Sequence, residues 1–483
     1  MKRHLDRWVR RLIRRQLART SPPALLRMGE AKLLRSFRRA AQHSAAYRQL
    51  LADAGVRPEQ IHSVADFRTR CPLLNKGNTF RRFPLSALIA TDVAPSAIGS
   101  VLTSSGHGGQ GHAFGITTRQ QGAAAVKAID LGLDMAFEVD RLRTLLINCL
   151  PMGVTFQSNA VCVANVSVRE DMACAIAAQS ASLFDQIILC GDPLFLKRLC
   201  DVSKAQGFDW RRFRMNAIIG EETFPESFRD HLAATFGLQL DDPTQGLIGS
   251  SMGVGELGLN LFNETRQTIA LRRACRRVPA LLAALCGPQA ASHPLPTFLA
   301  FNPLRTDVEI LSLDAAGQGE LVVTLLDAHT PVPLPRYQTG DRATLLDATH
   351  VQRCWAEHAG ASAPLALSLP LIALHGRAKD VLPGGWHVDT FKEALYRHPA
   401  HADRLSGAHR LSLGDGSRLR WEVQLGQGVD PCCAAEVAQA LHASLPSAPC
   451  APLASSDVHC LAYAAFPYGQ SIDYERKFTY WAG

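Results

Sequence analysis

The chain has 483 residues, of which 47% are hydrophobic and 19% are charged, and its formal net charge is +8. This composition is typical of a globular protein with two or three domains, and it excludes a disordered or collagen-like chain. No uninterrupted apolar run reaches the roughly 18 residues that a membrane-spanning helix requires. The 13 cysteines form no CxxC pair, and the arginine-rich start lacks the pattern of a secretory signal. We therefore expect reduced thiols and a cytoplasmic protein.

The positive charge is concentrated at the start of the sequence. Residues 1–50 contain 14 Lys and Arg against only Asp6 and Glu30, which gives this segment a net charge of +12. The remaining chain is weakly acidic, so we do not expect the main fold to bind nucleic acid.

Residues 1–20 predict a basic amphipathic helix. Arginines occupy the positions around an apolar stripe that recurs at helical spacing and consists of Leu5, Trp8, Val9, Leu12, Ile13 and Leu17. Three interpretations remain open from the sequence. The helix packs on the body through its apolar stripe, it makes peripheral contact with an anionic membrane surface, or it docks an acidic protein partner.

Strand-like and helix-like segments alternate along most of the remaining chain. Beyond helices at 24–52 and 119–137, we expect strands at 145–150, 161–168, 186–190, 215–219 and 237–240, separated by helices at 172–182, 193–206 and 225–236. Residues 298–346 are β-rich, and the piece after Gly376 has a helix at 390–396, a strand at 418–425 and a helix at 433–445.

This alternation predicts a multi-domain α/β fold, in which β-sheets are flanked by helices. We expect a large N-terminal domain over residues 1–374, with a small β-rich subdomain near its end. A small α+β C-terminal domain is expected over residues 375–483.

The stretch Ser104–Gly111 is a loop of hydroxyl and glycine residues. Glycines let successive backbone N–H groups converge on one point, and the serines add hydroxyl donors. Such a concavity suits an anion, most often a phosphate chain. A glycine-rich turn that binds nothing is the alternative when the loop is considered alone.

Four further motifs each carry one charged side chain. Residues 249–258 predict a flexible glycine-rich turn that carries Glu256, whose carboxylate is the hard oxygen ligand that Mg²⁺ prefers. Asp341 ends a strand-like segment, where it can accept hydrogen bonds from ribose hydroxyls. Arg377 lies in a Gly-Arg-x-x-Asp sequence and Lys477 in an aromatic-rich tail. Taken singly, each is also compatible with an ordinary surface role.

In their order and spacing, these motifs resemble those of the adenylate-forming enzymes, which include acyl-CoA synthetases and the adenylation domains of peptide synthetases. Within that superfamily they resemble the phenylacetate–CoA ligase-like branch, over about residues 40–400. The matching segments are Ser104–Gly111, Met252–Glu256, Tyr337–Asp341, Gly376–Asp380 and Lys477, together with the similar segments Ala54–Pro58, Pro72–Lys76 and Gly220–Glu222.

The resemblance implies a two-step ligation. The carboxylate of an aryl or acyl carboxylic acid attacks the α-phosphate of ATP and expels pyrophosphate, and the thiol of CoA or of a carrier-protein pantetheine then displaces AMP. The C-terminal domain would be mobile and would rotate about a hinge near Lys379. A basic N-terminal helix would suit an acidic acyl carrier protein.

The resemblance also implies roles for single residues. Glu256 would bind Mg²⁺, and Lys477 would bridge the carboxylate and the α-phosphate. The residues that would bind ATP or AMP are Ser104, Ser105, Gly106, Gly108, Gly109, Glu221, Met252, Asp341 and Arg377.

The sequence departs from the family pattern at both motifs that face the phosphates. His107 and Gly108 replace two threonines, and Gln110 and Gly111 replace a lysine and a proline. In the second motif, Gly255 replaces the hydroxyl residue before the glutamate. Either His107 compensates as a catalytic hydrogen-bond donor, or the protein uses ATP weakly.

Two alternative functions therefore remain open. The first is a catalytically degraded relative that binds a carboxylic acid or acyl intermediate without ATP turnover, and the second is acyl transfer to a protein cysteine, as in acyl-protein synthetases. Cys354, between His350 and His358, lies where the phenylacetate–CoA ligase-like branch often carries a cysteine pair. Because only one cysteine is present, no zinc is expected.

Overall fold

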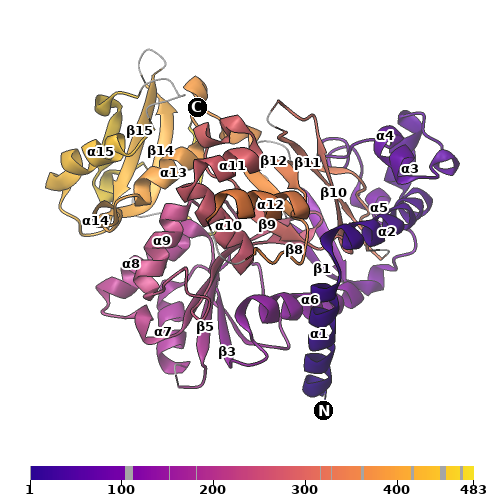
Figure 1. Cartoon of the computed structure of the whole chain (residues 1–483), viewed down its shortest axis with the longest axis horizontal. Helices are drawn as coiled ribbons and strands as arrows, with labels where there is room; N and C mark the ends of the chain where they lie inside the picture. Colours follow the sequence, from indigo (N-terminus) through magenta and orange to yellow (C-terminus); the bar gives the residue numbers. More distant parts are fainter. Residues whose placement is uncertain are drawn as a thin grey trace.

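The computed structural model describes residues 2–103, 112–151, 153–180, 182–315, 317–327, 329–360, 364–414, 418–446, 453–467 and 472–482. Within these residues the centre of the fold is an 11-stranded sheet with the order β10-β11-β12-β13-β9-β8-β7-β6-β5-β3-β4. Helices flank the sheet, as Figure 1 shows, and the N-terminus lies at the lower edge of that view. The expected α/β fold class is confirmed.

One half of the large sheet is parallel and runs from β4 to β7. Strands β3 (Thr144–Asn148) and β5 (Gln186–Gly191) are buried at every position, because helices cover both faces here. The other elements of this half are β4 (Cys162–Asn165), β6 (Met215–Ile219), β7 (Ile248–Val254), α6 (Arg119–Phe137), α7 (Glu170–Ser180), α8 (Pro193–Ala205) and α9 (Glu226–Phe236).

The other half of the sheet is antiparallel, and its strands between residues 297 and 346 match the β-rich segment expected from the sequence. Strand β12 (Tyr337–Leu346) pairs with β13 (Leu371–Arg377), which places two of the motifs on neighbouring strands. The remaining elements are β8 (Gly258–Asn263), β9 (Thr297–Phe301), β10 (Thr306–Leu311), β11 (Gly319–Leu325), α10 (Arg266–Arg277), α11 (Pro279–Cys286) and α12 (Ala348–His358).

The chain after β13 forms a three-stranded sheet with its own helices. Its core continues into the parallel half, where the rings of Phe228 and Tyr396 lie 4.9 Å apart. Residues 375–377 belong to the last strand of the large sheet, so the division into two domains stays a prediction. The elements are α13 (Val388–Tyr396), α14 (Pro399–Ala402), β14 (Leu405–Leu413), β15 (Leu419–Leu425), α15 (Ala434–Ala443) and β16 (Val458–Leu461).

The single helix expected over residues 24–52 is wrong, because the chain forms two helices there. Helix α2 (Pro22–His43) ends at Ser44, and α3 (Ala45–Asp53) begins after it. The Ser44 hydroxyl accepts a hydrogen bond from the backbone N–H of Tyr47 and so caps the second helix.

Two other expectations are also wrong. Residues 237–240 form no strand: Gly237 ends α9 in the left-handed conformation, and Leu238 and Leu240 only anchor the following loop to the core. The glycine-rich stretch 249–258 is largely strand, since β7 and β8 pair as a hairpin and only a short turn around Glu256 separates them.

Helix α1 (Lys2–Arg19) confirms the helix expected at the start of the chain, and it lies beside α6 (Figure 1). Among the described helices, none combines the length and apolar character that crossing a bilayer requires. The remaining elements are α4 (Val64–Arg70), α5 (Leu85–Leu88), β1 (Ile98–Thr103) and β2 (Phe114–Thr118).

Candidate functional site

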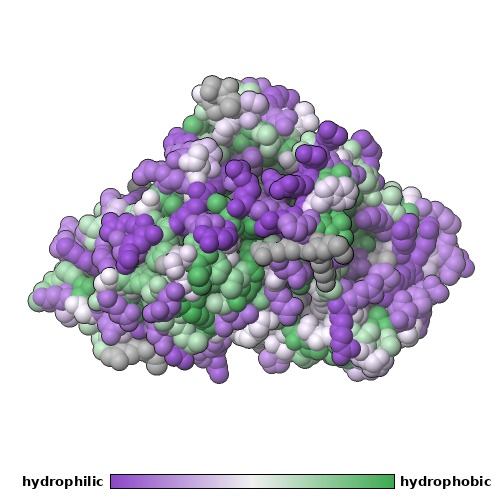
Figure 2. All heavy atoms as spheres, turned by 90° about the horizontal axis from the view of Figure 1, so that it is seen from below, coloured by the Kyte–Doolittle hydropathy of each residue, from purple (hydrophilic) through white to green (hydrophobic). Residues whose placement is uncertain are grey.

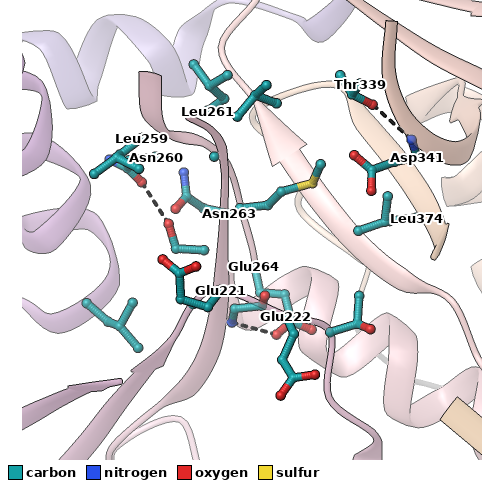
Figure 3. Close-up of a pocket in the computed structure, with 18 of the residues that line it drawn as sticks. Glu221, Glu222, Leu259, Asn260, Leu261, Asn263, Glu264, Thr339, Asp341 and Leu374 are labelled. Atoms are coloured by element: carbon teal, nitrogen blue, oxygen red, sulfur yellow. Dashed lines mark hydrogen bonds between the residues drawn. The ribbon is translucent and has the colours of Figure 1, made fainter. Parts of the chain in front are cut away.

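A cavity with a volume of about 1650 Å³ lies between the large sheet and the C-terminal tail. Glu221 and Glu222 project from one side of it, and Thr339 and Asp341 from another (Figure 3). All the site residues expected from the sequence that the structure describes line this cavity, namely Glu221, Met252, Glu256, Asp341, Arg377, Lys379 and Lys477.

Asp341 and Arg377 form an ion pair in the cavity wall. They are opposite each other on β12 and β13, and Nε of Arg377 donates to Oδ1 of Asp341 at 3.1 Å. The charge of buried Asp341 is the main cause that raises the pKa of Arg377 above its usual value. The backbone N–H of Asp341 donates to Oγ1 of Thr339 at 3.1 Å (Figure 3). The strand pairing therefore presents a carboxylate and a guanidinium side by side.

Glu256 is buried in the turn between β7 and β8 and pairs with a lysine that the sequence analysis did not assign. Nζ of Lys76 lies 2.8 Å from Oε1 of Glu256. Tyr337 lies nearby, and burial followed by the negative charge of Glu256 raises the pKa of its hydroxyl. Lys76 also lines the cavity, so this wall carries a cation as well as a carboxylate.

The C-terminal tail is held to the end of β6 by two adjacent glutamates. Nζ of Lys477 lies 3.1 Å from Oε2 of Glu221 and donates to the backbone oxygen of the same residue at 3.2 Å. Glu222 accepts from the hydroxyl of Tyr480 at 2.9 Å and from Nζ of Lys392 at 2.6 Å. Glu221 has a φ of 68°, which is uncommon for a residue other than glycine. Glu221, which is expected to bind ATP or AMP, is thus in direct contact with the predicted catalytic residue Lys477.

Met252 and Lys379 also line the cavity. Met252 is on β7 and packs partly into the core beneath the cavity. Lys379 is in the 3₁₀ turn Ala378–Asp380, directly after β13. Burial, and next the positive charge of Arg377, lower the pKa of Lys379. This is the place where the sequence predicts a hinge, and the hinge motion stays a prediction.

Asp192 is a titratable group in the cavity wall that the sequence analysis missed. Its side chain caps α8 by accepting from the backbone N–H of Phe195 at 3.0 Å. Burial is the main cause that raises the pKa of Asp192 to about 7, and the charges of Glu222 and Glu221 add to it. A strongly raised carboxylate pKa inside a cavity is a common mark of functional sites.

The expected phosphate loop lies outside the described residues. These are Ser104, Ser105, Gly106, His107, Gly108 and Gly109, whose roles stay predictions. The described chain stops at Thr103, the last residue of β1, which lines the cavity.

Cys354 is buried in α12, where its sulfur lies 3.6 Å from Nε2 of His350. The described parts of the chain contain no group of three or more His, Cys, Asp or Glu side chains placed to hold a metal.

A comparison with known protein families finds no matching family, and no curated protein matches the sequence. Solved structures do match. The structure of 2-hydroxyisobutyryl-CoA ligase in the postadenylation state, in complex with R3-HIB-AMP, has a TM-score of 0.62 at 14% identity, covering 95% of this chain and 89% of that chain. The chain has the fold of adenylate-forming CoA ligases.

Two other states of the same ligase share this adenylate-forming fold. The open conformation with 2-HIB-AMP and CoA has a TM-score of 0.54 at 14% identity, covering 96% of this chain and 91% of that chain. The thioesterification state with the same ligands has a TM-score of 0.53 at 15% identity, covering 95% of this chain and 89% of that chain. The fold implied by the resemblance is confirmed, whereas the phenylacetate–CoA ligase-like branch stays a prediction.

Proposed function

We propose that the protein uses ATP to activate a carboxylic acid as an acyl-adenylate, and then transfers the acyl group to the thiol of CoA or of a carrier-protein phosphopantetheine. One observation carries the proposal: Glu256, Asp341, Arg377 and Lys477 come from four separate motifs and line one cavity. The fold supports it, because a ligase with this fold holds an acyl-AMP in one structure and an acyl-AMP with CoA in another.

In the first step, a carboxylate oxygen of the acid forms a bond to the α-phosphorus of ATP, and the bond from that phosphorus to pyrophosphate breaks. The leaving group takes up negative charge, so the protein contributes mainly positioning and cations. Asp341 would accept hydrogen bonds from the ribose hydroxyls, while the hydrogen bond from Arg377 holds its carboxylate in orientation. Lys477 would exchange its contact with Glu221 for the acid and the α-phosphate.

Magnesium fits this site through Glu256. Mg²⁺ at ATP sites binds one or two carboxylates together with the phosphates of the substrate. Glu256 offers one buried carboxylate in the cavity wall, and the bound ion would neutralise the phosphates of the leaving group. Lys76 holds this carboxylate in place, and it brings a positive charge to the site.

The decisive test is ATP–pyrophosphate exchange with a panel of aromatic and aliphatic carboxylic acids in the presence of Mg²⁺. We expect exchange with at least one acid, and release of AMP with thioester formation when CoA or a phosphopantetheine thiol is added. If no acid supports exchange while some acids still raise the melting temperature, the protein binds acids without activating them.

A catalytically degraded relative is the second candidate, and a specific observation favours it. Lys76 already neutralises Glu256, and Gln110 stands where the phosphate loop of the family has a lysine. Such a protein would bind a carboxylic acid with the same affinity in the presence and absence of Mg²⁺ and ATP. Calorimetric titration of the acid under both conditions separates the two candidates.

A further inference from the structure

Helix α1 is attached to the body of the protein by its arginines. Arg10 donates from Nε and Nη2 to the two carboxylate oxygens of Asp140, at 3.2 and 2.5 Å. Nη1 of Arg14 lies 2.6 Å from Oδ2 of Asp134, and Nε of Arg7 lies 3.5 Å from Asp140. Arg10, Asp134 and Asp140 are all buried. The side that contacts α6 and the turn after it is therefore the charged side.

The acidic groups under the helix explain this orientation. Asp130, Asp134 and Asp140 are buried, and a buried carboxylate without a cation is costly. Burial lowers the pKa of Arg10. The hydrogen bond to Asp140 and the negative charges of Asp140, Asp130 and Asp134 outweigh burial, so the pKa of Arg10 is raised overall. Turning the apolar stripe inward would leave these carboxylates unpaired. The interpretation that α1 packs through its apolar stripe is wrong.

Most of the apolar stripe consequently faces outward, whereas its last residue, Leu17, is half-buried and lines the cavity. Leu5, Trp8 and Leu12 share one face of the helix and are 60%, 61% and 50% exposed, and Val9 and Ile13 beside them are also exposed. Figure 2 views the side of the molecule to which the N-terminus points, and hydrophobic residues lie there next to strongly hydrophilic ones. Large apolar side chains gathered on one helix face in this way mark an interaction surface.

Cations border the exposed apolar face. Arg11, Arg15 and Arg19 recur every four residues and are exposed, and none of them forms an ion pair within the described part of the chain. An apolar face that contains a tryptophan and is bordered by arginines is typical of helices that lie in a membrane interface.

We propose that α1 docks the protein on an anionic phospholipid surface. The helix axis lies in the plane of the membrane, Trp8 and Leu12 enter the boundary between headgroups and acyl chains, and Arg11 and Arg15 contact the phosphates. An acidic protein would pair with the arginines but gives no reason for the exposed apolar stripe. A second copy of α1 would bring like charges together. A lipid surface satisfies both the apolar face and its basic border.

Cosedimentation of the full-length protein with phospholipid vesicles tests the proposal. We expect binding to vesicles of equimolar phosphatidylcholine and phosphatidylglycerol, weaker binding at high salt, and little binding to phosphatidylcholine alone. The double variant Trp8→Ser and Leu12→Ser should weaken binding by roughly tenfold or more. Replacing Arg11 and Arg15 by Gln should weaken it by about fivefold per charge. The matched control Leu313→Ser removes a leucine that is 62% exposed elsewhere and should change nothing.

Fluorescence locates the contact on the helix. Anionic vesicles should shift the tryptophan emission of the protein to shorter wavelength, and Trp8→Phe should remove this shift. The proposal is overturned if the protein ignores anionic vesicles, if it binds both vesicle types equally, or if Leu313→Ser weakens binding as much as the α1 variants do. It is also overturned if Trp8→Ser dissociates an oligomer in light scattering, because the face then belongs to a second copy.

Discussion

Arg377 and Asp341 face each other across neighbouring antiparallel strands, and Nε of the arginine lies 3.1 Å from Oδ1 of the aspartate. Direct cross-strand partners project from the same face of a sheet, so the pairing of β12 with β13 alone fixes this contact. The two motifs are separate in the sequence, but they form one structural unit in the cavity wall.

Replacing Asp341 by Asn keeps the size of the side chain and removes its charge. Loss of a charge-assisted hydrogen bond to the ribose should raise the KM for ATP by about tenfold to a hundredfold, with a smaller effect on kcat. Steady-state kinetics of the exchange reaction measures both. The control is Asp314→Asn, an acid paired with Arg342 at 2.6 Å outside the cavity. Equal effects of the two variants would remove Asp341 from the nucleotide site.

Replacing Glu256 by Gln should abolish Mg²⁺-dependent exchange, with a loss on the order of a hundredfold or more, because the site loses its anionic metal ligand. The matched control is Glu309→Gln, which alters another buried carboxylate, one that pairs with Arg336 at 3.0 Å away from the cavity. That variant should lower stability and leave the Mg²⁺ dependence unchanged. Unaltered exchange in the Glu256 variant would show that the metal binds elsewhere.

Replacing Lys477 by Ala should slow adenylation by about a hundredfold or more, since a positive charge at the α-phosphate acts mainly in the transition state. Thioester formation from a supplied acyl-adenylate should be much less affected. Rapid-quench measurements of the two steps separate these outcomes. Lys204→Ala, which removes an exposed lysine paired with Asp403, is the control. If both steps slow equally, Lys477 has a structural role in the tail.

The motifs selected from the sequence contribute residues that line one cavity, and the roles of these residues stay predictions. Glu256 lies in the turn between β7 and β8, whereas Asp341 lies within β12, not at a strand end as expected, and is the cross-strand partner of Arg377 on β13. The pairing of Lys76 with Glu256 was not predictable in this way. It joins the N-terminal segment to a turn far along the chain, and no local pattern specifies such a contact.

The orientation of α1 was not predictable either, because it also depends on contacts between distant parts of the chain. The sequence shows an apolar stripe and an arginine face, but the choice between them depends on aspartates more than a hundred residues away. The expected strand at 237–240 failed for a related reason, because two leucines in a loop reproduce the spacing of a strand. The spacing of hydrophobic residues indicates which side chains share one face of an element, but it does not specify the element that packs against that face.

Asp192 should make stability depend on pH. The pKa of Asp192 is about 7 in the folded state, against a usual value of 3.8. Between these two pH values the folded state binds more protons than the unfolded state, so the stability of the protein falls as the pH rises from 3.8 to about 7. Asp192→Asn keeps a good helix cap but cannot ionise. Urea unfolding at about pH 4 and about pH 8 should therefore show a smaller loss of stability in the variant than in the unchanged protein. Identical losses would mean that Asp192 does not titrate in this range.

Arg10 holds α1 to the body, so replacing it by Ala should destabilise the protein strongly. The change leaves Asp140 buried without its two-pronged partner, and breaking a buried pair on one side costs about 3–5 kcal/mol. Urea unfolding measures the loss, and limited proteolysis should show earlier cleavage within α1. Arg10→Lys keeps the charge with fewer hydrogen bonds, so its stability should lie between that of Arg10→Ala and that of the unchanged protein. Arg11→Ala, on the exposed side, should stay within about 0.5 kcal/mol of the unchanged protein. If Arg10→Ala and Arg11→Ala behave alike, the arginine face does not hold the helix.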